Sequence, residues 1–91
     1  MYLKTMYGTY INTTQVQSFD VMKDDEGDYV VKAFMDYDGS EEYPVATFKE
    51  MNEAQVFLDN LMPLIGKVVN YMDAVYAMEK EKNWKKVKRV N

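Results

Sequence analysis

The chain has 91 residues, of which 47% are apolar and 14% aromatic, and its net charge is −4. This composition indicates one small folded domain with a thin core, and it excludes an intrinsically disordered chain. Histidine and cysteine are both absent, which excludes disulfides, the common zinc sites and the Cys–His and Ser–His–Asp nucleophile systems. We therefore expect a non-enzymatic protein that uses no metal and no cofactor.

The opening residues, MYLKTMYGTY, lack the apolar segment of a secretory signal, and no later run approaches the length of a membrane span. We expect a cytoplasmic protein that does not enter a membrane.

The first fifty residues show the alternation that is typical of β-strands. β-Branched and aromatic residues recur with period two and predict strands at residues 2–6, 15–22, 28–37 and 43–49. In the third of these strands, one face is assigned to the core and contains Tyr29, Val31, Ala33, Met35 and Tyr37. A second apolar face is predicted from Phe19, Val21, Val30 and Phe34.

Two acidic segments separate these strands, and each contains a glycine. Asp38-Gly39 predicts a type I′ hairpin. A calcium-binding EF-hand loop needs glycine at its sixth position, but a loop starting at Asp24 has Tyr29 there, and one starting at Asp36 has Glu41. We expect hydrated turns at opposite ends of a strand, with no metal site. The same carboxylates form a candidate acidic surface: Asp24, Asp25, Glu26, Asp28, Asp36, Asp38, Glu41 and Glu42.

From residue 52 onward, apolar residues recur at helical spacing, with Asn52 as the expected N-cap. Pro63 interrupts this pattern and predicts either one kinked helix or a break between two helices, and the unbroken phase favours the kink. Beyond Pro63 the apolar stripe runs further than a small sheet can cover, which predicts a dimer or partner surface. Its residues are Leu64, Val68, Tyr71, Met72, Val75 and Met78. The alternative is a helix that folds back at Pro63 onto the second sheet face.

Charge is divided unevenly along the chain. Residues 1–60 carry a net charge of −8, and residues 61–91 carry +4. The basic tail, residues 80–91, contains Lys80, Lys82, Trp84, Lys85, Lys86, Lys88 and Arg89. It is interpreted as a solvated helix end, as a contact for an acidic protein surface in another copy or another protein, or as a phosphate contact with Trp84 stacked on a base. The acidic remainder disfavours nucleic acid as a partner.

Three segments, GTYINTTQVQSFDV, YVVKAFMDYDG and YPVATFKEMNEAQVFLDNL, resemble small uncharacterised proteins of Gram-positive bacteria and their phages. The resemblance covers residues 1–62 and implies a short antiparallel meander followed by one helix, with no catalytic residues. Some small acidic phage proteins inhibit host nucleic-acid machinery, such as CRISPR effectors, and the analogy here is one of size and charge.

The sequence thus predicts an α+β protein with a four-stranded antiparallel meander and a long C-terminal helix, kinked or broken near Pro63. The expected domain covers residues 1–79, with the sheet in 1–50 and the helical part in 52–79, and the basic tail follows. The expected function is that of a small interaction protein that forms a homodimer through the helix and binds an unidentified protein. The alternatives are an inhibitor that presents its acidic surface to nucleic-acid-handling machinery, and a nucleic-acid binder that uses the tail.

Overall fold

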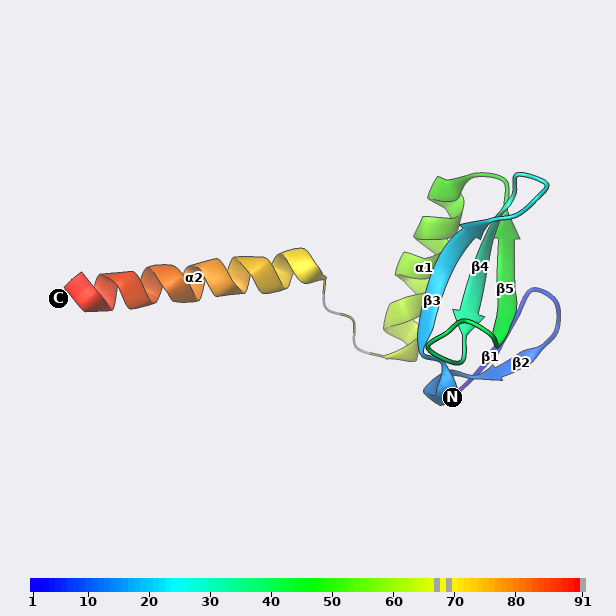
Figure 1. Cartoon of the computed structure of the whole chain (residues 1–91), viewed down its shortest axis with the longest axis horizontal. Coiled ribbons are helices and arrows are strands. Elements are labelled where there is room, and N and C mark those ends of the chain that lie inside the picture. The colour runs from blue at the N-terminus through cyan, green and yellow to red at the C-terminus, as the bar shows by residue number, and fades with distance from the viewer. Residues whose placement is uncertain (67, 69, 91) are drawn as a thin grey trace.

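The computed structural model describes the backbone of residues 1–66, 68 and 70–90, and the side chains of residues 1–66, 68 and 70–80. It is an α+β protein in which a sheet lies against one helix and a second helix projects as an arm (Figure 1). The elements are β1 (Tyr2–Lys4), β2 (Tyr10–Asn12), a 3-10 turn (Thr13–Gln15), β3 (Ser18–Lys23), β4 (Tyr29–Phe34), β5 (Glu42–Phe48), α1 (Met51–Ile65) and α2 (Tyr71–Val90).

The described strands form two antiparallel sheets. β3, β4 and β5 pair in chain order, and β1 pairs with β2 as a separate hairpin. The α+β class is confirmed, but the single four-stranded meander with one long helix is wrong. The reason lies at Gly8, whose φ of +86° reverses the chain soon after β1. The Thr5 hydroxyl, in a residue only 5% exposed, accepts the backbone N–H groups of Tyr7 and Thr9 and holds the hairpin closed.

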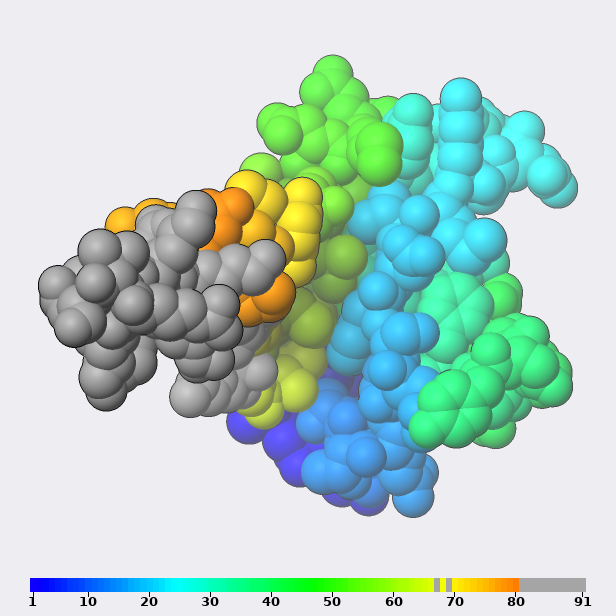
Figure 2. Space-filling model, turned by 60° about the vertical axis from the view of Figure 1, so that its left-hand side comes forward, coloured from blue at the N-terminus to red at the C-terminus, as the bar shows by residue number. Residues whose placement is uncertain are grey.

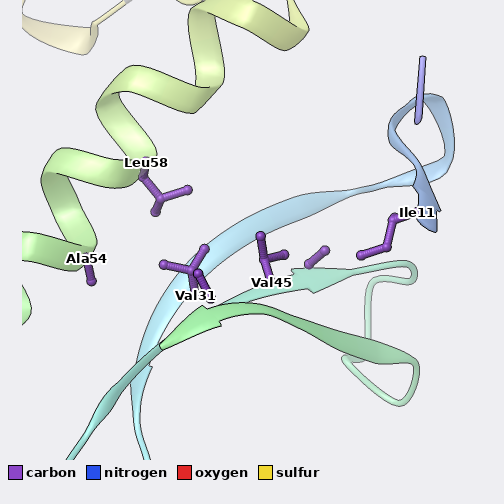
Figure 3. Close-up of a cluster of buried hydrophobic side chains, with 7 residues drawn as sticks. Ile11, Val31, Val45, Ala54 and Leu58 are labelled. Carbon is purple, nitrogen blue, oxygen red and sulfur yellow. The ribbon is translucent and has the colours of Figure 1, made fainter. Parts of the chain in front are cut away.

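The core lies on the inner face of the three-stranded sheet. Val31 and Ala33 are fully buried there, as predicted, whereas Tyr37 is 95% exposed because β4 ends at Phe34. Figure 3 shows how two separate elements cover this face: Leu58 of α1 lies at one end, Ile11 of β2 lies at the other, and Val45 of β5 lies between them.

The outer face of this sheet mixes polar and apolar side chains and is not covered by the described part of α2. Phe19 pairs with Ala33, and Val21 pairs with Val31, so Phe19 and Val21 lie on the inner face and pack against the core. The predicted second apolar face is therefore wrong for Phe19 and Val21, whereas Val30 and Phe34 lie on the outer face as predicted. The outer face also includes the ion pair between Lys32 and Glu42, whose Nζ and Oε1 atoms are 2.7 Å apart. α2 projects away from the sheet and α1 (Figure 1), and its described side chains, residues 71–80, are exposed (Figure 2).

The helical part is broken close to Pro63, but at Gly66. Pro63 lies in the last turn of α1, where its missing N–H removes a single helical hydrogen bond. At Gly66 the backbone becomes extended, with φ −172° and ψ −167°. A new helix follows Asn70, whose Oδ1 accepts the Met72 N–H at 2.9 Å as an N-cap. The kinked single helix is thus wrong, and the predicted basic tail, apart from residue 91, is the second half of α2.

The start of α1 also differs from the prediction. The N-cap is Glu50 and not Asn52, and it makes no side-chain capping bond. Backbone geometry and the burial of Ala54 therefore fix the helix start more than a capping side chain does.

The packing of α1 gives a test of this core. Leu58 is 8% exposed and Val56 is 49% exposed on the same helix. We expect Leu58→Ala to lower the free energy of unfolding by about 2–4 kcal/mol, because it removes buried methyl groups and leaves a cavity. Val56→Ala should change it by less than about 0.5 kcal/mol. Urea denaturation followed by circular dichroism measures both, and equal effects of the two changes would contradict this packing.

Candidate functional site

The described part of α2 is an exposed apolar arm. Every residue from 71 to 80 is exposed. At 100° per residue, Tyr71, Val75 and Met78 lie on one side of the helix and Met72 flanks them. We call these four residues the arm surface. Two members of the predicted partner set lie elsewhere: Leu64, 72% exposed, is on α1, and Val68 lies between the helices. The structure therefore divides the predicted set at the helix break.

The basic half of α2 continues this arm. Lys80 places its Nζ 5.3 Å from the centre of the Tyr76 ring, a cation–π contact. The other predicted tail residues lie on α2, and their side chains fall outside the described residues: Lys82, Trp84, Lys85, Lys86, Lys88 and Arg89.

The first acidic segment forms the tight turn between β3 and β4. The carboxylate of Asp24 accepts the N–H groups of Glu26 and Asp28, at 3.0 and 2.8 Å. Gly27 supplies the positive φ of +85° that closes the turn. Asp28 also pairs with Lys49, with Oδ1 and Nζ 3.2 Å apart. Asp24 and Asp28 thus serve the local backbone and its neighbours, while Asp25 remains at the exposed tip.

The second acidic segment forms a longer loop at the opposite end of the sheet (Figure 1). Asp38 accepts the Ser40 N–H at 2.9 Å, and this bond is the main reason that the pKa of Asp38 lies below its usual value. Asp36 accepts the Ser40 hydroxyl at 2.7 Å. Of these loop residues only Gly39 has positive φ, so the predicted type I′ hairpin is wrong. The physical reason is that β4 ends at Phe34, which leaves seven residues between the strands.

The eight predicted carboxylates therefore do not form one surface. Asp24, Asp25, Glu26 and Asp28 lie at one end of the sheet, and Asp36, Asp38, Glu41 and Glu42 lie at the other. Within the described residues, no three acidic side chains come together as ligands for a metal ion. The absence of a metal site stays a prediction.

The role of Asp24 as a backbone acceptor is testable against its neighbour. Asp24→Ala should lower the free energy of unfolding by about 1–2 kcal/mol, because two turn N–H groups lose their acceptor. Asp25→Ala removes the same charge from the same turn, but no side-chain hydrogen bond of Asp25 is seen in the described structure, so it should be close to neutral. Thermal unfolding of the two variants measures both effects, and an equal loss of stability would show that removal of the charge alone is responsible.

We further predict that neither acidic turn binds a divalent ion specifically. Calorimetric titration with Ca²⁺ should give no dissociation constant below about 10 µM, the range of calcium sensors. Tighter binding that Asp24→Ala or Asp36→Ala abolishes would contradict the prediction.

An apolar groove that the sequence did not reveal lies between β1, β5 and α1. Its volume is about 410 Å³, and it is lined by Leu3, Lys4, Thr5, Met6, Val45, Ala46, Phe48, Phe57 and Leu61. Phe48 and Phe57 pack with their ring centres 5.3 Å apart, and Met6 lies on the rim, 68% exposed. The Met6 N–H donates to the Val45 carbonyl at 2.8 Å and fixes the hairpin against β5. Helical periodicity could identify Phe57 and Leu61 as one stripe, but not the hairpin that faces them.

A second, polar pocket of about 400 Å³ lies between β2 and the loop before β5. It is lined by Tyr2, Thr9, Tyr10, Ile11, Asn12, Gln15, Met35, Glu41 and Tyr43. The Tyr43 hydroxyl donates to Glu41 Oε1 at 3.2 Å, and this bond to a carboxylate raises the pKa of Tyr43. Tyr43 thus stays protonated at neutral pH. The raised pKa means that this contact does not activate the Tyr43 hydroxyl as a nucleophile.

Comparison with protein-family models, curated proteins and solved structures finds no match for this chain. The similarity to small sheet-plus-helix proteins of Gram-positive bacteria and phages stays a prediction. In the described residues, neither helix has a stretch long and apolar enough to cross a membrane.

Proposed function

We propose that this chain is a small, non-enzymatic interaction protein that self-associates through α2. One observation carries the proposal: the arm surface is apolar, helical and exposed along its whole described length. Apolar side chains grouped in this way on a projecting element are typical of a contact surface. The proposed setting is the cytoplasm.

The stability of α2 also supports a partner. Its 20 residues form a helix that gains little from its own sheet, and helices of this length in water depend on packing of an apolar face. An interface that buries about 1,000 Å² of apolar area gains about 25 kcal/mol before costs. Association entropy and side-chain ordering offset much of that gain, which leaves a micromolar dimer within reach.

The other functions have less support. An acidic inhibitor would need its carboxylates on one surface, but they lie at two ends of the sheet. Six of them bond to nearby groups of the chain: Asp24, Asp28, Asp36, Asp38, Glu41 and Glu42. A nucleic-acid binder would have to bring a unit of net charge −8 close to phosphates. For an enzyme, the two pockets described above offer one hydrogen-bonded pair of titratable side chains, Tyr43 and Glu41.

A charge placed on either side of α2 tests the proposal. Light scattering at about 10 µM should give the mass of a dimer for the native chain. Val75→Glu, on the arm surface, should weaken association at least tenfold, which corresponds to about 1.4 kcal/mol. Ala77→Glu adds the same charge about 160° away around the helix and should leave the dimer intact. A monomeric native chain, or equal loss in both variants, would refute self-association through this surface.

A further inference from the structure

We infer that the apolar groove of one copy receives α2 of a second copy, in a reciprocal exchange of arms. The inference rests on the proposed self-association and names the surface that α2 contacts. It replaces a direct α2–α2 contact with two identical arm-in-groove contacts.

The two surfaces match in chemistry. The groove is lined mainly by aliphatic and aromatic side chains, with Met6 exposed on its rim and Leu61 half-buried on its wall. Leu64 continues the Phe57–Leu61 stripe one turn further along α1 and is 72% exposed. The arm surface offers the complementary feature, a short helical stripe of Tyr, Met and Val. Laying α2 along this stripe covers apolar atoms that are open to water on both sides.

Charge agrees with an antiparallel contact. Antiparallel to α1, the arm surface lies beside the C-terminal turns of α1, and the basic half of α2 points toward the N-terminus of α1. That end of the molecule is acidic. It carries Glu50 and Glu53, and the pairing of Tyr29 with Phe48 brings the Asp24–Asp28 turn to the same end. The six cations between residues 80 and 89 thus meet carboxylates in this direction. A parallel arrangement would carry them past the C-terminal end of α1, toward the end of the sheet with the second acidic segment, 36–42.

The lengths agree with this arrangement. At about 1.5 Å per residue, the 20 residues of α2 span about 30 Å, and the 15 residues of α1 span about 22 Å. The arm therefore extends past the start of α1, and its basic turns lie over the acidic end.

The area of contact favours exchange over a direct seam between two arms. The apolar stripe of α2 ends at Met78, after about two turns. The area buried by a single contact between two arms would therefore be near or below the roughly 1,200 Å² at which specific interfaces begin. A reciprocal exchange buries the arm contact twice. Compared with a parallel seam, it also avoids placing the two basic halves beside each other.

The second copy, and not the same chain, is the inferred source of the arm. The backbone leaves α1 at Gly66 in an extended conformation, and α2 runs away from its own sheet and helix (Figure 1). An arm directed outward in this way leaves its own groove open and reaches another molecule.

Because the chain contains no cysteine, pairs of single cysteines can report the contact directly. One chain carries Met6→Cys on the groove rim and is labelled with ¹⁵N. The other is unlabelled and carries Met72→Cys on the arm surface. After the two are mixed, a short bismaleimide should give a mixed crosslinked dimer, which mass spectrometry identifies from its peptides. In the control, Met22→Cys replaces Met6→Cys. Met22 lies on the outer face of β3 and is 43% exposed, so this pair should give at least tenfold less crosslinked dimer.

The outcomes separate this inference from the proposed function. Crosslinks only between two Met72→Cys chains would show direct pairing of arms, which overturns the exchange and leaves self-association standing. A native monomer that crosslinks within a Met6→Cys/Met72→Cys double variant would show an arm folded onto its own groove, and would overturn both. A native monomer without crosslinks would also overturn both.

A second variant tests the groove without a crosslinker. Met6→Glu places a charge on the exposed rim and should weaken the dimer at least tenfold by light scattering. Met22→Glu should not weaken it. The circular dichroism spectrum of Met6→Glu should match that of the native chain, because Met6 is exposed. A folded Met6→Glu variant that dimerises as the native chain does would refute the groove as the receiving surface.

Discussion

The structure depends on one packing constraint, which is that α1 alone does not cover the inner face of the three-stranded sheet. The contact between α1 and the sheet is built around small residues, with Ala54 on the helix and Ala33 and Ala46 on the strands, all at most 6% exposed. Small side chains allow the helix and the sheet to approach closely, but they cover little of the sheet beyond the contact itself. The hairpin β1–β2 therefore supplies Ile11 at the far end of the sheet, and the apolar groove is the space left between the two covers.

The pairing of β5 adds to this effect. Its register shifts between Val31 and Lys32 of β4, so that Val31 faces Ala46 while Lys32 faces Pro44. Val45 is the extra residue of this bulge, and both it and Ala46 are buried. A bulge bends its strand and increases the local twist. The same irregularity exposes the Val45 carbonyl to the Met6 N–H, so the hairpin and the groove wall have a common structural origin.

The sequence predicted local features better than it predicted how they pack. Period two located four of the described strands, β1, β3, β4 and β5, and the burial of Val31 and Ala33 followed from it. Alternation does not say which strands pair, however, and Tyr2–Lys4 pairs only with its own hairpin neighbour. Continuous helical phase concealed the break, although Gly66 and the Asn70-Tyr71-Met72-Asp73 cap were readable signals of it. The arm surface could be predicted from spacing alone, whereas the groove joins residues from three distant segments and needs the fold.

A remaining physical question is whether arm-in-groove contacts stop at a pair of copies or continue to further copies. Such a contact joins two different surfaces, so it can close as a reciprocal pair or continue from copy to copy as an open chain. Each added copy in an open chain gains one contact, but closure gains the second contact without a further loss of translational freedom. Charge also favours the closed pair. In a closed pair, each folded unit of net charge −8 receives one basic arm, whereas an open chain leaves one acidic unit and one basic arm unpaired at its ends. The short stripe of α2, too small to hold a copy firmly by itself, thus favours the closed pair that uses it twice.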